Sequence, residues 1–110
     1  MRFIISTREY ESVYQKNTKL ENELFIFLVQ KEIPEQEIPE KNFAVGIVVS
    51  KKVGISVIRN KVKRRIKAFL REKKECFPTN TKIVIIAKQK AGNADWLGIK
   101  QHLSELFNRI

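Results

Sequence analysis

The sequence predicts one α+β domain, in which helices and strands alternate along 110 residues. Residues 24–30, 43–50 and 83–88 are apolar runs of strand length. Three other segments place apolar residues at helical spacing. The length suits a single hydrophobic core rather than two. We therefore expect residues 1–110 to fold as one domain.

The first half of the chain predicts one helix and at least one strand. Ser6 and Glu9 form a capping-box pair ahead of apolar residues at helical spacing, which predicts a helix over residues 6–17. Residues 24–30 are apolar on both alternating sets, as is typical of a strand buried on both faces. Residues 18–21 suit a short additional strand.

The strand predicted at residues 43–50 follows a polar connection at residues 31–41. Its two faces differ in size. The odd-numbered residues, beginning with Phe43, are bulky, whereas the even-numbered residues, beginning with Ala44, are mostly small. Small side chains along one face allow another backbone or a ligand to approach closely.

The second half predicts a long helix, a strand and a closing helix. Gly54 ends the preceding strand, and Ser56 is expected to cap a helix that runs to about residue 76. The strand at residues 83–88 follows, and a helix over residues 95–109 closes the chain. The residues available for its apolar stripe are Leu97, Ile99, Leu103, Leu106 and Phe107.

Charge is distributed very unevenly along the chain. Ten of the 22 basic residues lie between residues 41 and 71, and none of the 12 acidic residues does. Since the remaining acids and bases balance, the whole net charge of +10 comes from that segment. Such a block creates a local positive field and repels itself, so a polyanion is the expected partner. The alternative is a solvated surface helix that is merely basic.

The spacing within the basic helix favours a ligand. At about 100° per residue, one arc gathers the apolar residues Ile58, Val62, Ile66, Phe69 and Leu70. The opposite arc carries Asn60, Lys63, Arg64, Lys67 and Arg71, with Arg59 and Arg65 at its borders and Lys61 to one side. No carboxylate within residues 56–71 can neutralise these cations. Because guanidinium groups bind phosphate in bidentate fashion, nucleic-acid backbone is the expected partner.

RNA fits this pattern better than DNA. Arg59, Asn60 and Arg64 could read a DNA major groove, but the helix lies between two strands rather than after a short helix-turn. Recognition of RNA by shape and phosphate suits a mixed domain. Tyr10 and Tyr14, on one face of the first helix, could stack on unpaired bases or belong to the core.

Several function classes are disfavoured by composition. No apolar run approaches the roughly 18 to 20 residues of a membrane span, and the apolar stretch after Met1 is too short for a signal peptide. The lone Cys76 cannot form an internal disulfide, which fits a reducing compartment, so we expect a cytoplasmic protein. The only histidine, His102, lies outside the basic segment, which holds no acid for a metal; a protein nuclease is therefore not favoured.

Two motifs resemble the signature of the bacterial ribonuclease P protein component. The first is Ser50-Lys51-Lys52-Val53-Gly54, and the second, Arg59-Asn60-Lys61-Val62-Lys63-Arg64, begins five residues after Gly54. The family pattern is S-K-K-hydrophobic-G followed by R-N-x-hydrophobic-K-R, and the order of elements resembles the family along the whole chain. The resemblance implies an αβββαβα two-layer sandwich, with a four-stranded sheet and a left-handed βαβ crossover. General rules alone would predict a right-handed one.

The resemblance also implies a function. The family protein is the small subunit of a ribonucleoprotein that removes the 5′ leader from precursor tRNA. The chemistry belongs to the RNA subunit and its Mg²⁺ ions. The expected partners are thus the catalytic RNA and precursor tRNA, with no DNA, no membrane and no metal held by the protein alone.

Two sets of site residues follow from the resemblance. Those implied to bind the RNA subunit are Lys51, Arg59, Asn60, Lys61, Lys63, Arg64, Arg65, Lys67 and Arg71. Those implied to form the cleft for the single-stranded leader are Tyr10, Tyr14, Leu28, Val48, Ser50, Lys52 and Lys88. Lys52 also shares strand parity with Ser50 and Val48, on the small face of the strand at residues 43–50.

The chain departs from the family pattern at three positions. Ile55 stands where Asn is common, Lys67 where Arg is common, and Val48 where a small polar residue is frequent. A lysine at position 67 replaces a bidentate fork with a point charge. Two other classes remain open, a structural RNA-binding protein such as a ribosomal protein and a sequence-specific DNA-binding protein. The nucleic acid that co-purifies would separate them.

Overall fold

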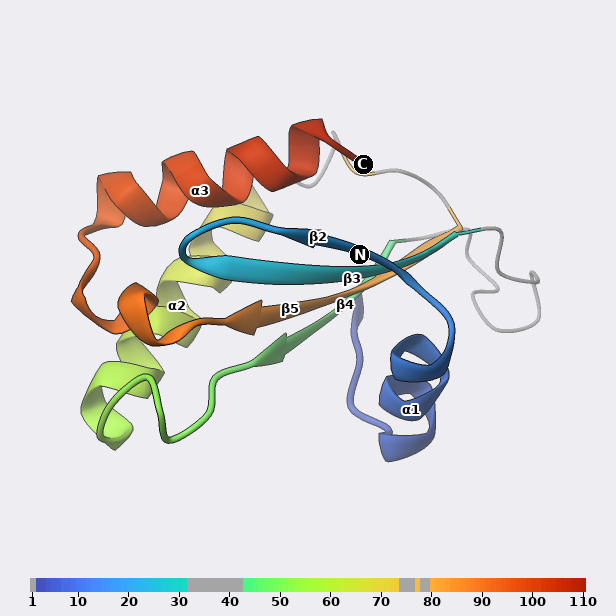
Figure 1. Ribbon diagram of the computed structural model, residues 1–110, viewed down its shortest axis with the longest axis horizontal. Helices are drawn as coiled ribbons and strands as arrows, with labels where there is room; N and C mark the ends of the chain where they lie inside the picture. The colour runs from blue at the N-terminus through green and yellow to red at the C-terminus, as the bar shows by residue number, and fades with distance from the viewer. Residues whose placement is uncertain (1, 32–42, 74–76, 78–79) are drawn as a thin grey trace.

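The protein folds around one open sheet with helices on both faces (Figure 1). This computed structural model describes residues 2–31, 43–73, 77 and 80–110. In chain order the elements are β1 (Arg2–Phe3), α1 (Thr7–Gln15), β2 (Thr18–Glu21), β3 (Phe25–Lys31), β4 (Ala44–Val48), α2 (Ser56–Glu72), β5 (Thr81–Ala87), the 3-10 helix η2 (Gln89–Asn93) and α3 (Trp96–Asn108). The predicted α+β class is confirmed.

The five strands lie in the order β1-β4-β5-β3-β2. Strands β2 and β3 pair antiparallel, as do β3 and β5, whereas β4 and β5 are parallel and are joined through α2. Figure 1 shows that this crossover is left-handed, because α2 lies behind the sheet. Four strands match the expected sheet. The fifth, β1, adds two residues parallel to the edge of β4, with Arg2 opposite Ala44 and Phe3 opposite Val45.

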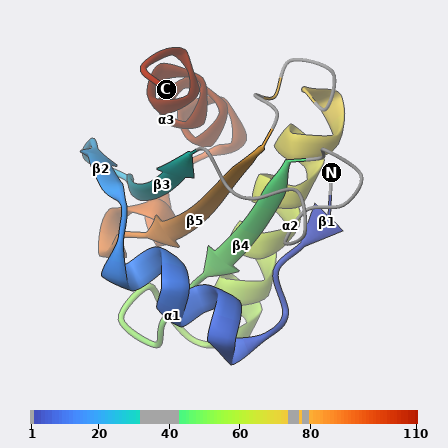
Figure 2. The ribbon, with the colours of Figure 1, turned by 90° about the vertical axis from the view of Figure 1, so that its right-hand side faces the viewer.

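The two faces of the sheet are covered unequally. Figure 2 shows α1 on one face and both α2 and α3 on the other. The α2 and α3 face holds the main core, which includes Phe25, Phe27, Val45, Ile83 and Ile85 from the sheet, Val62, Ile66, Phe69 and Leu70 from α2, and Ile99, Leu103 and Leu106 from α3. The four buried residues of α2 belong to the apolar arc expected from the sequence, which is therefore confirmed.

The face under α1 is less completely covered. Ile26 and Leu28 of β3 are only half-buried, although Phe25, Phe27 and Val29 on the other face are buried. The expectation that this strand is buried on both faces is therefore wrong for one face. The physical reason is that the single helix α1 covers this face, whereas two helices cover the other.

Helix starts were predicted with mixed success. Ser6 occupies the N-cap position of α1, but its side chain makes no capping hydrogen bond. Ser56 does not cap α2, because Ile55 is the N-cap residue and offers no acceptor. Asp95 does cap α3, accepting a hydrogen bond from the Gly98 N–H at 2.7 Å.

The apolar stripe of α3 is narrower than predicted. Ile99, Leu103 and Leu106 are buried and Phe107 is half-buried, but Leu97 is 60% exposed. Residues that are two positions apart in a helix are separated by about 200° around its axis. Leu97 therefore points away from the stripe that contains Ile99. The connection predicted at residues 31–41 (beyond Lys31 of β3), together with Lys41 and Cys76, lies outside the described residues.

Candidate nucleic-acid interface

Helix α2 carries its polar residues on the side opposite the core, as the periodicity predicts. Val62, Ile66, Phe69 and Leu70 fix the helix against the sheet and α3. On the outer side Asn60, Lys61, Arg64 and Arg71 are exposed, while Lys63 and Lys67 are half-buried. One helix thus presents a continuous row of donors to solvent.

These cations have no acidic partners in the described part of the chain. Every ion pair found there joins residues outside α2, and the hydrogen bonds of α2 side chains include none to a carboxylate. Like charges at helical spacing repel one another by a few tenths of a kcal/mol per pair. The outer side of α2 therefore retains an uncompensated positive field that an anion can neutralise.

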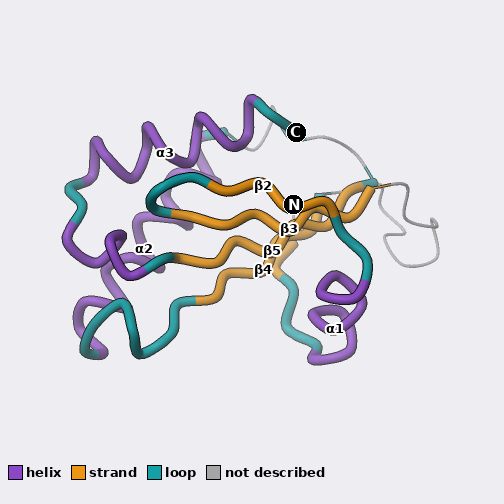
Figure 3. Tube along the Cα trace, viewed as in Figure 1, coloured by secondary structure: helices purple, strands orange, loops and turns teal. Residues whose placement is uncertain are grey.

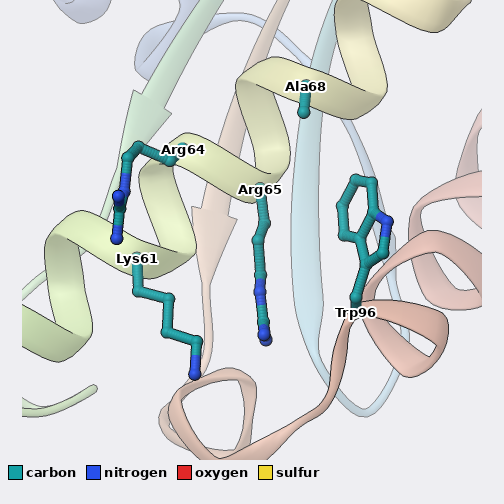
Figure 4. Close-up of a pocket in the computed structure, with 5 residues that line it drawn as sticks. All are labelled: Lys61, Arg64, Arg65, Ala68 and Trp96. Atoms are coloured by element: carbon teal, nitrogen blue, oxygen red, sulfur yellow. The ribbon is translucent and has the colours of Figure 1, made fainter.

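Two shallow hollows lie along this side of α2. One is lined by Val57, Asn60, Lys63, Arg64 and Lys67. The other is lined by Lys61, Arg64, Arg65 and Ala68 of α2 and by Trp96 of α3 (Figure 4). Arg64 belongs to both, so its guanidinium stands between two surfaces that a bound chain could occupy.

Two cations of α2, Arg65 and Lys67, also contact other parts of the fold. Arg65 donates a hydrogen bond from Nη1 to the Ala94 carbonyl at 3.0 Å, which joins α2 to the segment before α3. Arg59 is half-buried, and its Nε has no hydrogen-bond partner. Lys67 Nζ lies 5.3 Å from the centre of the Phe3 ring, within cation–π range. Arg65 and Lys67 therefore hold α2 against neighbouring segments, in addition to contributing positive charge.

Lys51 and Lys52 lie on an exposed turn rather than on the strand. β4 ends at Val48, and the Val53 N–H donates to the Ser50 carbonyl at 3.1 Å. The strand parity expected for Lys52 is therefore wrong, because the chain has already turned. Figure 3 shows this loop at the same end of the sheet as η2. A side chain at Gly92 would lie 2.3 Å from the Val53 carbonyl, so the two segments are packed closely.

The small face of β4 is occupied by a tyrosine. A Cβ at Gly46 would lie 2.6 Å from the Tyr10 ring, and Tyr10 packs with the buried Ile4 and Ala44. Burial raises the pKa of Tyr10, and a backbone hydrogen bond with Ile47 opposes that shift. The close approach predicted from the small residues is confirmed, and the approaching group comes from α1.

Tyr14 differs from Tyr10 in its surroundings. It is 47% exposed, and its ring centre lies 6.2 Å from that of Tyr10. The proposed leader residues Leu28 and Val48 are half-buried on the same face of the sheet, and Ser50 is exposed beyond the end of β4. Tyr14 is therefore the aromatic residue of this pair that remains available to a ligand.

Lys88 is already held by neighbours. Its Nζ donates to the Asn22 carbonyl at 2.9 Å and pairs with Glu21 at 2.5 Å. The ion pair lowers the pKa of Glu21, with Lys88 as the main cause. Lys88 thus joins the β2–β3 turn to the end of β5, and any anion that binds it would have to compete with Glu21.

A charged network that sequence reasoning missed joins α1 to the sheet. Arg2 donates two hydrogen bonds to the Glu9 carboxylate, at 3.1 and 2.7 Å, and Lys82 Nζ lies 3.6 Å from the same group. The side chain of Lys82 is only 3% exposed. Hydrogen bonding to Arg2 lowers the pKa of Glu9. The available signal was a lysine that directly precedes the apolar run at residues 83–87.

Two absences concern the described residues only. No three His, Cys, Asp or Glu side chains there gather closely enough to hold a metal ion. No helix among them is long and apolar enough to cross a membrane. His102 is half-buried, and its Nδ1 lies 2.8 Å from the Gly98 carbonyl, so its ring is engaged within α3.

Comparison with known proteins decides the family. The sequence profile of the family described as Ribonuclease P matches residues 2–110. The chain belongs to this family. Membership associates it with ribonuclease P and tRNA processing, and it implies an RNA partner within a ribonucleoprotein.

Curated relatives agree along nearly the whole length. The ribonuclease P protein component of Bacillus cereus (strain Q1) is 32% identical over 101 residues, covering 92% of this chain and 84% of the relative. That of Bacillus velezensis is 34% identical over 101 residues, covering 92% and 82%.

Solved structures agree in fold. The Staphylococcus aureus RNase P protein has a TM-score of 0.86 and 29% identity, covering 97% of this chain and 93% of that one. The Thermotoga maritima RNase P protein has a TM-score of 0.80 and 28% identity, covering 94% and 92%. The resemblance seen in the two motifs is therefore confirmed across the fold.

Proposed function

We propose that this chain is the protein subunit of the ribonuclease P ribonucleoprotein, in which it binds the catalytic RNA and the 5′ leader of precursor tRNA. It assists endonucleolytic removal of the leader, which produces the mature 5′ end. The observation that carries the proposal is the outer side of α2, whose cations have no carboxylate partner among the described residues.

The catalytic RNA is bound by α2 and the turn before it. The exposed residues Lys61 and Arg64 offer positive charge to phosphate, and the exposed Asn60 offers a directed hydrogen-bond donor. Lys51 extends the positive surface toward the β4–α2 loop. The remaining members of this set are Arg59, Lys63, Arg65, Lys67 and Arg71. Because these contacts are to phosphate, the affinity depends strongly on salt.

The leader lies on the α1 side of the sheet. Tyr14 supplies an exposed ring for a base to stack on, and Tyr10 supports it from the half-buried position over Gly46. Leu28 and Val48 contribute apolar surface from the sheet. Ser50, Lys52 and Lys88 supply polar groups near the ends of β4 and β5, and Lys88 exchanges Glu21 for phosphate when the leader binds.

Catalysis belongs to the RNA subunit and to Mg²⁺ held mainly by that RNA. The described residues offer no cluster of ligands for the ion. The protein supplies positive charge around the RNA, which lowers the Mg²⁺ concentration needed for activity. In this role it works in the cytoplasm with RNA partners and needs neither DNA nor a membrane.

Reconstitution tests the proposal directly. Purified protein free of RNA should leave precursor tRNA intact, and addition of a ribonuclease P RNA should release the 5′ leader at a lower Mg²⁺ concentration than the RNA needs alone. Leader removal that survives exhaustive nuclease treatment of the protein would contradict the assignment of catalysis to RNA. Specific co-purification with ribosomal RNA or DNA, and no effect on ribonuclease P RNA, would favour the alternative classes.

A further inference from the structure

The hollow beside Trp96 has a composition that the rest of the α2 surface lacks. Lys61, Arg64, Arg65 and Ala68 come from successive turns of α2, and Trp96 is the first residue of α3. Figure 4 shows the Arg65 side chain lying between Lys61 and the Trp96 indole, with Ala68 above it. The hollow measures about 480 Å³ and is open to solvent, a size common for sites that hold small groups.

The walls combine cations with one large aromatic ring. None of the five lining residues is acidic. The nearest acid in sequence, Asp95, accepts a hydrogen bond from the Gly98 N–H and so caps α3. Lys100 Nζ lies 4.9 Å from the centre of the Trp96 ring, which adds a fourth cation at this edge. These walls therefore favour a ligand that is anionic and carries a flat surface.

The position of the ring is fixed by the fold. Trp96 is half-buried and packs against the main core, and Arg65 is held by the Ala94 carbonyl two residues earlier. The small side chain of Ala68 leaves room beside the indole. A base entering the hollow would thus meet a ring that is already oriented, which reduces the entropy cost of binding.

We propose that this hollow takes one unpaired nucleotide of the RNA bound by α2, with its base stacked against Trp96 and its phosphate on Lys61 and Arg64. Aromatic rings stack on bases of any sequence, and the adjacent cations track the backbone. The neighbouring hollow, lined by Val57, Asn60, Lys63, Arg64 and Lys67, has no ring and takes backbone alone. Arg64 joins the two, so the RNA passes from one hollow to the other across it.

This inference rests on the proposed function, because it assumes that α2 binds the RNA subunit. It adds a contact from α3, outside the basic helix and outside the leader-binding set. It also predicts a distinct energetic signature. Loss of Trp96 should weaken binding without removing a phosphate contact, so the salt dependence should stay unchanged.

The chain offers a direct probe, since Trp96 is its only tryptophan. Titration of ribonuclease P RNA into the wild-type protein should quench the tryptophan emission as the complex forms, because a stacked base quenches indole. Binding measured in parallel by filter retention shows whether the complex exists. RNA that binds without any change in emission overturns the Trp96 contact and leaves the proposed function intact. Absence of RNA binding overturns both.

Three variants complete the test. Trp96→Leu keeps apolar volume but removes the stack, and should weaken binding of the RNA about 5- to 150-fold with an unchanged salt slope. Trp96→Phe keeps a ring and should recover most of that loss. Leu97→Ala is the matched control, because Leu97 is exposed next to Trp96 but does not line the hollow. Melting curves select conditions in which every variant is folded.

Wild-type affinity in Trp96→Leu, or an equal loss in Leu97→Ala, would overturn the inference. The source of the nucleotide is tested with adenosine monophosphate. At concentrations where the RNA subunit saturates the protein, the free mononucleotide should leave the emission unchanged. Quenching by adenosine monophosphate in that range would assign the hollow to a free nucleotide and overturn the RNA contact.

Discussion

Helices α1 and α2 lie on opposite faces of one sheet (Figure 2). Charged residues near α1 form ion pairs, whereas the cations of α2 form none among the described residues. On the α1 side, Glu9 is paired with Arg2 and Lys82. Beyond the end of β5, Lys88 is paired with Glu21 of the edge strand β2. On α2, the outward cations have no carboxylate partner in the described part of the chain.

The difference shows what each group of cations does. Paired cations stabilise contacts between elements. Arg2 of β1 and Lys82 of β5 both pair with Glu9, which holds α1 against these two strands. The outward cations of α2 repel each other, and none of them contacts a carboxylate among the residues that the structure describes. An anion that binds there relieves this repulsion, and we therefore propose that α2 rather than α1 binds phosphate.

The exposed chemistry of the two helices also differs. α1 presents the ring of Tyr14, whereas α2 presents ammonium and guanidinium groups. Stacking on a ring depends weakly on salt, but neutralisation of phosphate depends on it strongly. The two surfaces should therefore be distinguishable by the salt dependence of the binding that each variant removes.

The largest expected effect separates the two tyrosines of α1. Tyr10→Ala should lower the free energy of unfolding by about 2 to 4 kcal/mol, because the ring fills the space over Gly46, though less completely than a fully buried aromatic residue. Tyr14→Ala should change stability little. It should weaken binding of precursor tRNA by about 1 to 3 kcal/mol, with mature tRNA nearly unaffected.

Urea unfolding and binding to both RNAs check this prediction. The binding loss in Tyr14→Ala should be the same at low and high salt. A large fall in stability with an equal loss of both RNAs would assign Tyr14 to the core and remove it from the leader surface.

The next effect concerns the paired charges. Glu9→Gln should lower the free energy of unfolding by about 1 to 2 kcal/mol near neutral pH, because it removes the anion facing Arg2 and the buried Lys82. The solvent exposure of Arg2 keeps the value modest. Urea unfolding of wild type and variant measures it.

The difference in stability between wild type and Glu9→Gln should depend on pH with a definite sign. The folded protein lowers the pKa of Glu9 from its ordinary value of 4.5, so the unfolded chain binds this proton more readily. The stabilisation is complete above the unfolded pKa and is lost as the pH falls through the lower folded pKa. Wild type and Glu9→Gln should therefore converge in acid. A stability difference that persists unchanged there would show that the carboxylate charge is not responsible.

The smallest effect concerns the start of α2. Ile55 is the N-cap residue, is 70% exposed and offers no acceptor to the first turn. Ile55→Asn should raise the free energy of unfolding by about 1 kcal/mol, because an asparagine can cap the free N–H groups. Ile5→Asn is the matched control, since Ile5 is also an exposed isoleucine but caps no helix. Equal effects of the two substitutions would show that capping is not the cause.

The elements of the fold followed from local pattern where they are long. The short strand at residues 18–21, which the sequence alone barely supports, is present as β2. β1 was not predicted, because two residues carry no period and the strand exists only through its pairing with β4. The capping-box interpretation failed because Arg2 and Lys82, distant in sequence from one another, hold the Glu9 carboxylate.

The candidate site shows the same division. Helical periodicity predicted which face of α2 is buried, because Ile66 and Leu70 repeat at the helical spacing. It could not predict that Arg65 is anchored to Ala94 or that Lys88 is held by Glu21, because these partners come from other elements. Trp96 likewise joins the α2 surface only through the packing of α3.

The salt dependence of RNA binding tests the central claim, that unpaired cations of α2 bind the ribonuclease P RNA through phosphate. With about four to six phosphates neutralised, log K against log[salt] should slope near −3 to −5 for the wild type. Arg64→Ala should flatten the slope by about one unit. Lys90→Ala, which removes a cation paired with Glu23 at 2.8 Å, should leave it unchanged. An Arg64→Ala slope equal to that of the wild type would contradict the account.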